Sequence, residues 1–146
     1  MQKVSGLDAS FSGLHAQRTR MNVIASNLAN AQSTRTPEGG PYTRKEVILG
    51  AQRQRSPFET ALQDHLQDGV SEVHVLDIAN DGHGPRLEYD PGHPDANAQG
   101  YVAYPNISVM HEMVDLLAAT RAYEANVTAI NAAKDMSLKA LQIGRG

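Results

Sequence analysis

Residues 7–28 read LDASFSGLHAQRTRMNVIASNL, and a leucine or methionine recurs there every seven residues, at Leu7, Leu14, Met21 and Leu28. Further apolar side chains fill the complementary positions of the same repeat: Val4, Phe11 and Ala25. A seven-residue spacing keeps one stripe of a helix facing a helical partner. The stretch therefore predicts a long helix that packs along one side.

A similar pattern lies near the other end of the chain. The residues that carry it are Met113, Leu116, Thr120, Tyr123, Val127, Ile130 and Leu141. Alanines between 118 and 133 favour helix formation and keep this helix thin. We therefore predict one helix from about Ser5 to about Ala31, and a second from a cap at Asn106 or Ser108 to about Ile143.

The middle of the chain is predicted to be rich in strands. TPEGGP at 36–41 ends the first helix, because two prolines and two glycines cannot continue it. Apolar runs bounded by turn residues predict strands over 42–49, 70–78, 86–89 and 101–104. Phe58, Leu62 and Leu66, spaced four apart, leave a short helix open within 51–68.

The predicted fold is mainly α with a small β-rich insert. Segments 1–33 and 105–146 are expected to form the terminal helices, which pair as a coiled coil and build the assembly core. Segment 34–104 is expected to form a loop and a lobe of short strands between them. Helices at the two termini point to assembly, since most domains are frayed there.

Charge is distributed unevenly along the 146 residues. Residues 1–55 hold eight basic residues (Lys or Arg) and three acidic residues (Asp or Glu). Residues 56–104 hold one basic and nine acidic residues, and residues 105–146 hold four of each. This segregation would help copies or partners meet in register, or it reflects an acidic insert that is merely solvated. The basic segment has little aromatic interleaving and the whole chain is acidic, which argues against a nucleic-acid partner.

Several classes of site and segment are not expected. Cysteine is absent, which excludes disulfides, thiolate nucleophiles and Cys-based zinc sites. The first residues lack the apolar run of a cleaved signal peptide, and no run of about 18 apolar residues predicts a membrane span. Export, if it occurs, is therefore expected without cleavage of a signal.

The residue patterns of metal and catalytic sites are also weak. None of the six histidines stands in an H-x-x-x-H or H-E-x-x-H arrangement. Asp77, Asp81 and Glu88 match positions of a calcium loop, but Ala79 and Pro85 occupy two positions that need other residues. Asp-Gly-His and Asp-Pro-Gly-His, at 81–83 and 90–93, are explained by turn formation. We expect neither an enzyme nor a cofactor.

The segment MNVIASNLANA at 21–31, followed by Thr34 and TPEGGPY at 36–42, resembles the N-terminal signature of bacterial flagellar rod and hook proteins. The form ending in TPEGGPY is similar to that of proximal-rod members in particular. YDPGHPDA at 89–96, GYV and YPN within 100–106, EMVD at 112–115 and ATRAYEAN at 119–126 extend the likeness. Residues 51–85 add nothing to it.

The resemblance implies a structural subunit of the flagellar basal-body rod, which crosses the periplasm. It implies export through the flagellar type III apparatus without signal cleavage. It implies as partners further copies of the chain, the other proximal and distal rod proteins, and the adaptor between rod and export gate. The alternative from the helical pattern alone is a coiled-coil adaptor that binds a single partner.

We expect the assembly interface on both helices and the family signature in the loop. The N-terminal set is Leu7, Phe11, Leu14, Met21, Ile24, Asn27, Leu28 and Asn30. The C-terminal set is Met113, Leu116, Leu117, Tyr123, Asn126, Val127, Ile130 and Leu141. The signature loop comprises Thr36, Pro37, Gly39, Gly40, Pro41 and Tyr42. The asparagines either hydrogen-bond across helices or face solvent and cap helix ends.

Overall fold

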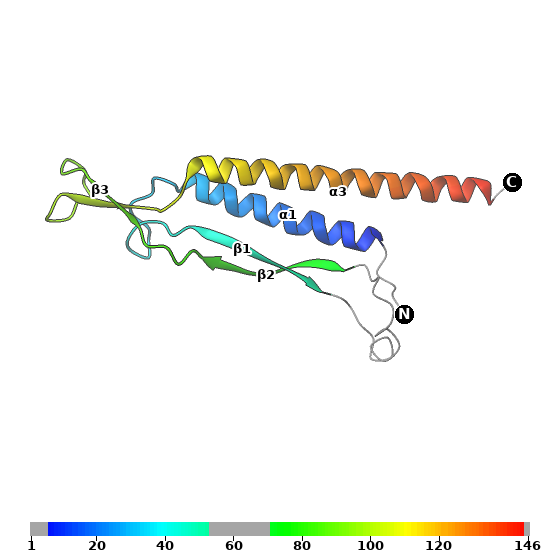
Figure 1. Ribbon diagram of the computed structural model, residues 1–146, viewed down its shortest axis with the longest axis horizontal. Coiled ribbons are helices and arrows are strands. Elements are labelled where there is room, and N and C mark those ends of the chain that lie inside the picture. The colour runs from blue at the N-terminus through cyan, green and yellow to red at the C-terminus, as the bar shows by residue number, and fades with distance from the viewer. Residues whose placement is uncertain (1–5, 53–70, 145–146) are drawn as a thin grey trace, which may run out of the picture.

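The computed structural model describes residues 6–52 and 71–144, and within them it confirms the two predicted long helices. Helix α1 spans Gly6–Ala29 and helix α3 spans Val109–Ile143. They lie side by side and run in opposite directions (Figure 1). The Ser108 side chain caps α3 by accepting a hydrogen bond from the backbone N–H of His111, as the sequence suggested.

Helix α3 extends well beyond α1. It has 35 residues against 24, a difference of about 16 Å at the rise of an α-helix. Asn27 contacts Glu112 and Gly13 lies against Asn126, so the antiparallel register places Gly6 opposite the residues just before 134. Residues 134–143, hereafter the overhang, therefore project past α1 (Figure 1).

A two-stranded antiparallel sheet packs along α1. Its strands are β1, Lys45–Gln52, and β2, Glu72–Asn80. The backbone N–H of Val73 donates to the Ser12 hydroxyl at 3.0 Å, which attaches the sheet to the helix. Leu76 is the extra residue of a β-bulge in this ladder. The sheet, α1 and α3 form three successive layers of an elongated body (Figure 1).

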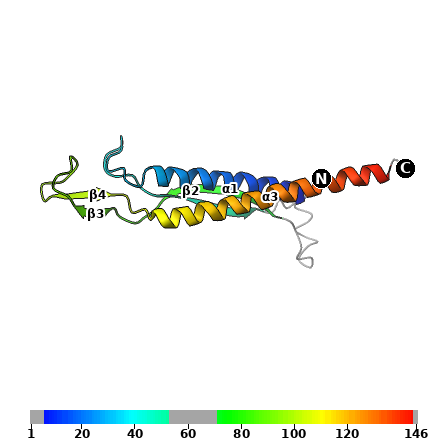
Figure 2. The same cartoon turned by 90° about the horizontal axis from the view of Figure 1, so that it is seen from above.

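The second sheet stands apart. Strands β3, Arg86–Tyr89, and β4, Tyr101–Tyr104, pair antiparallel and keep the bounds predicted for them. They contact no other helix or strand of the described part. They lie at the end of the molecule opposite the C-terminus (Figure 2). The predicted β-rich insert between the helices is therefore confirmed, but it forms two separate sheets rather than one lobe, and one of them lines α1.

Strand boundaries differ from the prediction for a local reason. The first strand was expected over 42–49 but begins at Lys45, because the backbone N–H of Tyr42 donates to the Ser33 carbonyl rather than to a ladder. The predicted second strand starts at residue 70, which lies outside the described residues. Of the possible helix at 51–68, residues 53–68 lie outside them too, and residues 51 and 52 belong to β1. The observed strand ends at Asn80, two residues later than expected.

The buried residues of α1 are Ala16, Ile24 and Asn27. None of them belongs to the seven-residue series, Leu7, Leu14, Met21 and Leu28, whose members are all half-buried. These three residues share an arc of about 80° on the helix. Because α1 packs against α3 on one side and the β1–β2 sheet on another, its most covered face lies between them. The seven-residue series runs beside this face rather than along it.

Candidate functional site

A buried polar junction joins both helices to the start of β1. At its centre is Asn27, whose side chain is 1% exposed. Its amide nitrogen donates to the carbonyl of Lys45 at 2.8 Å and to Oε2 of Glu112 at 3.1 Å. Its amide oxygen accepts from the backbone N–H of Lys45 at 3.0 Å and from the Tyr42 hydroxyl at 3.1 Å. Asn27 thus uses its full hydrogen-bonding capacity within the chain.

Glu112, on α3, supplies the negative charge of the junction and is 1% exposed. Its Oε1 accepts from Nε of Arg44 at 2.8 Å. A buried carboxylate is tolerated when it is paired and hydrogen-bonded, and Glu112 has both kinds of partner. Three segments far apart in sequence therefore meet at one ion pair.

Arg44 is held by acidic groups on several sides. Besides Glu112, its NH1 lies 3.5 Å from Asp81 and 3.9 Å from Glu46. Burial of the guanidinium acts to lower the pKa of Arg44, but the hydrogen bond and charge of Glu112, with Glu46 and Asp81, outweigh it. The net shift in pKa is upward, so Arg44 remains charged.

Asp81 extends the junction to the residue that follows β2, at the same end of the β1–β2 sheet as Arg44. Its backbone N–H donates to the Arg44 carbonyl at 2.7 Å, and its carboxylate contacts the ring and the backbone N–H of His83. These bonds to His83 lower the pKa of Asp81, and the charges of His83 and Arg44 add to the effect. The short Asp-Gly-His stretch is thus a turn that positions Asp81 beside Arg44.

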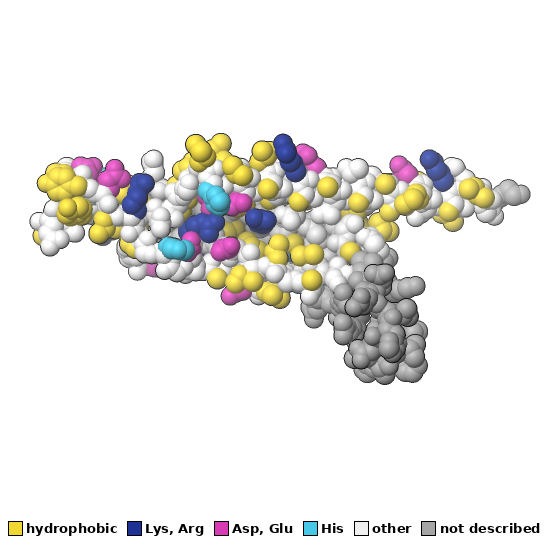
Figure 3. Space-filling view, viewed as in Figure 1, with side chains coloured by type: hydrophobic (Ala, Val, Ile, Leu, Met, Phe, Trp, Pro, Cys, Tyr) yellow, Lys and Arg dark blue, Asp and Glu magenta, His cyan; other side chains and the backbone are white. Residues whose placement is uncertain are grey.

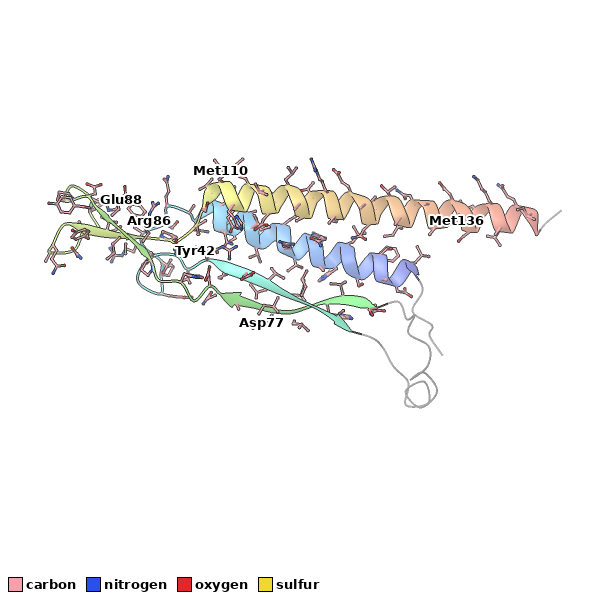
Figure 4. All side chains as sticks on the ribbon, viewed as in Figure 1. Tyr42, Asp77, Arg86, Glu88, Met110 and Met136 are labelled. Atoms are coloured by element: carbon pink, nitrogen blue, oxygen red, sulfur yellow. The ribbon has the colours of Figure 1, made fainter. Side chains whose placement is uncertain are left out.

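The signature loop folds back onto the end of α1. The backbone N–H of Thr36 donates to the Gly40 carbonyl at 2.9 Å, and that of Gly39 donates to the Thr36 carbonyl at 3.0 Å. Gly39 and Gly40 have φ of +89° and +76°, a region that strains residues with a Cβ. The tight turn places Tyr42 near the end of α1 (Figure 4), and the Tyr42 hydroxyl donates to the amide oxygen of Asn27. Pro37 and Pro41 flank the glycines.

A small pocket opens beside the junction, between α1, β1 and α3. Its lining joins aliphatic side chains to balanced charges: Arg20, Val23, Ile24, Asn27, Arg44, Lys45, Glu46, Val47, Leu49, Glu112 and Asp115. Arg20 and Asp115 form an ion pair across it, 3.6 Å apart. Within residues 6–52 and 71–144, no three His, Asp or Glu side chains converge as metal ligands would.

Comparison with known proteins agrees with this architecture. The family model described as "Flagella basal body rod protein" matches residues 7–35, and "Flagellar basal body rod FlgEFG protein C-terminal" matches residues 98–143. The flagellar basal-body rod protein FlgC of Bacillus subtilis is 45% identical, over 99% of this chain and 100% of its own. FlgC of Borreliella burgdorferi is 42% identical over 97% of both chains, and FlgC of Salmonella typhimurium is 39% identical over 94% and 95%.

The chain belongs to the FlgC family. The resemblance inferred from the signature residues is therefore confirmed, as is the expectation of a structural protein rather than an enzyme. No helix in the described part of this FlgC-family chain is long and apolar enough to cross a bilayer. The two family models cover both helices that meet at the junction, but not the start of β1.

The predicted interface residues of the N-terminal set, of which Asn30 lies just after α1, fall into three groups. Ile24 and Asn27 are buried, Asn27 within the polar junction and Ile24 beside the pocket. Phe11 is 55% exposed and available to a partner. The remaining positions are half-buried: Leu7, Leu14, Met21, Leu28 and Asn30. Asn27 does bond across helices, but to Glu112 of the same chain.

The predicted interface residues of α3 fall into two groups, half-buried and exposed. Asn126 lies where a Cβ on Gly13 would meet its amide nitrogen at 3.0 Å, so a glycine lets the helices approach there. Positions facing α1 are half-buried: Leu116, Tyr123, Asn126, Val127 and Ile130. Positions facing outward are exposed: Met113, Leu117 and Leu141. The role of both sets in assembly remains a prediction.

Sequence reasoning named Asn27 and Tyr42 but missed the charged residues of the polar junction. Glu112 was noted only within a family motif, and Arg44 was read as part of a strand. A charged residue at a helix start or beside a strand ordinarily faces solvent. Only the fold, which brings positions 27, 44 and 112 together, reveals that this pair is inside.

Proposed function

We propose that this FlgC-family chain is a structural subunit of the flagellar basal-body rod, and that it polymerises through its terminal helices. The observation that carries the proposal is the outer surface of α3. A stripe with helical spacing, Met110, Met113, Val114 and Leu117, is 79%, 57%, 61% and 53% exposed. Figure 3 shows hydrophobic side chains gathered along this edge of the molecule.

The stripe lies away from α1. Met110 is on the outer side of α3, and Glu112, between the stripe residues in sequence, faces the junction (Figure 4). Residues at i, i+3, i+4 and i+7 form one face of a helix. A contiguous apolar surface of this kind ordinarily marks a contact with another protein. In the rod, neighbouring subunits would cover it.

The junction gives the subunit a fixed shape to assemble. Glu112, Arg44 and Asn27 tie α3, β1 and α1 together at one end of the helix pair. Removing any one partner leaves a buried polar group unsatisfied, so alternative helix registers are disfavoured. We infer that this register presents the half-buried seven-residue series and the α3 stripe to neighbours, which extend the helix pair into coiled-coil-like packing.

The proposal also covers location and partners. The rod would cross the periplasm, and the chain would reach it through the flagellar type III export apparatus without loss of a signal peptide. Its contacts would be further copies, the other proximal and distal rod proteins, and the adaptor at the export gate. The names of the FlgC relatives, which are rod proteins of the basal body, support this placement.

An adaptor that binds one partner is the alternative, and the two proposals predict different results. A strain that lacks its own rod protein is supplied with the wild-type chain or with Met113→Asp/Leu117→Asp. We expect the wild-type chain in purified basal bodies, and the double variant excluded although it remains folded. Glu124→Gln, on an exposed position of the same helix, is the control and should be incorporated. Normal incorporation of the double variant would refute assembly through this face.

A further inference from the structure

The β3–β4 sheet carries an exposed apolar face. Leu87 and Ala103 are paired across the strands, as are Tyr89 and Tyr101, so all four side chains share one face. Leu87, Tyr89 and Tyr101 are 63%, 65% and 43% exposed. The two tyrosine rings are edge to face with centroids 5.3 Å apart, which holds the face in a fixed shape. An isolated two-stranded sheet is marginally stable in water, so a partner would stabilise it.

The overhang of α3, at the other end of the molecule, has two apolar faces. Leu138 and Leu141 are 49% and 65% exposed, and they share a face with Lys134. Met136 and Ile143, 66% and 82% exposed, lie on another face with Lys139. Figure 4 labels Met136 on this projecting end of the helix. Within the described residues, nothing packs against it.

The charges at the two ends are complementary. The segment 86–104 holds three carboxylates and one arginine, whereas 134–143 holds two lysines and one aspartate. Glu88 is paired with Arg86 at 3.3 Å, and Asp95 lies 3.9 Å from Arg35. Asp90, next to Tyr89, is exposed and has no ion-pair partner among the described residues. The lysines at 134 and 139 are likewise exposed and unpaired there.

We propose that the overhang of one copy docks on the Leu87–Tyr89–Tyr101 face of a second copy, with Lys134 beside Asp90. The proposal rests on the proposed function, since it names one contact between neighbouring subunits. The two surfaces lie at opposite ends of the elongated molecule, so a single copy cannot join its own (Figure 2). A contact between two different surfaces builds an open, rod-like assembly when the rotation between neighbouring copies does not close into a ring.

The absence of cysteine makes the test direct. Two full-length variants, Tyr89→Cys and Leu141→Cys, are made together in a strain that lacks its own rod protein, and assembled basal bodies are oxidised. A disulfide forms only when the two Cα atoms come within about 7 Å. We expect a cross-linked dimer of the two variants. The matched control replaces Tyr89→Cys with His74→Cys, an exposed position on β2, and should give no dimer.

Charge reversal adds a second measurement. Asp90→Lys should lower the yield of the Tyr89→Cys/Leu141→Cys dimer up to about fivefold, the upper end for an exposed ion pair. Adding Lys134→Glu to the partner chain should restore the yield. Two results would overturn the proposal. In the first, the wild-type chain enters the rod but the cysteine pair gives no dimer. In the second, the Leu141→Cys chain cross-links to a different protein. A wild-type chain that never enters the rod would instead refute the proposed function.

Discussion

Replacing Glu112 should expose how much the polar junction stabilises the fold. The Glu112→Ala variant removes the carboxylate that lies 2.8 Å from Nε of Arg44 and 3.1 Å from the Asn27 amide. Breaking a buried pair by deleting one partner costs about 3–5 kcal/mol. Arg44 is 20% exposed and keeps Asp81 at 3.5 Å, so the lower end, about 3 kcal/mol, is expected.

Two further variants separate charge from shape. Glu112→Gln keeps the size of the side chain but turns one acceptor into a donor, and should cost about 1–3 kcal/mol. Glu46→Gln is the control, because Glu46 is 68% exposed and 3.9 Å from Arg44. An exposed pair of this kind contributes at most about 1 kcal/mol.

The assay is urea unfolding of the purified full-length chain, followed by the helical signal in circular dichroism. The midpoint should fall with the slope unchanged if the variants alter stability alone. The order of loss should be Glu112→Ala, then Glu112→Gln, then Glu46→Gln. If Glu112→Ala were no less stable than Glu46→Gln, the buried Glu112–Arg44 pair would not stabilise the fold, and our reasoning would be refuted.

Three further predictions concern single positions. Gly40→Ala should lower the free energy of unfolding by about 1 kcal/mol, measured by thermal unfolding, because the φ of Gly40 is +76°. Gly82→Ala is the control and should leave the free energy of unfolding unchanged, because nothing lies within 4 Å of a Cβ there. Gly13→Leu should push α3 away at Asn126 and cost about 1–3 kcal/mol by the same measurement, and wild-type stability would show that the helices do not approach there. Asp81 has a lowered pKa, so its contribution to stability is complete above the unfolded value of 3.8 and disappears as pH falls through the lower folded value. Asp81→Asn should therefore flatten the acid limb of the stability curve, and an unchanged limb would contradict this.

Local signals in the sequence were sufficient for the elements. The repeat around Leu14 and the alanines of the second helix predicted both helices, and Ser108 was among the two predicted caps. The turn residues at 36–41 correctly ended the first helix. The predicted bounds of the two short strands, 86–89 and 101–104, were correct because prolines and glycines bound each strand.

Tertiary placement could not be predicted in the same way. Whether β1–β2 forms a lobe or lines α1 depends on contacts such as that between Val73 and Ser12, which leave no mark in the local pattern. The seven-residue series suggested one partner for α1, but α1 has two, so its buried face shifted to Ala16, Ile24 and Asn27. Glu112 is buried only because Arg44 and Asn27 arrive from elsewhere.

The most direct test of the account is a density map of the assembled rod that resolves side chains of this subunit. We expect the outer stripe of α3, Met110, Met113, Val114 and Leu117, to be covered by neighbouring subunits, while the Glu112–Arg44 junction stays inside its own chain. A map in which that stripe faces solvent along its length would contradict assembly through the terminal helices.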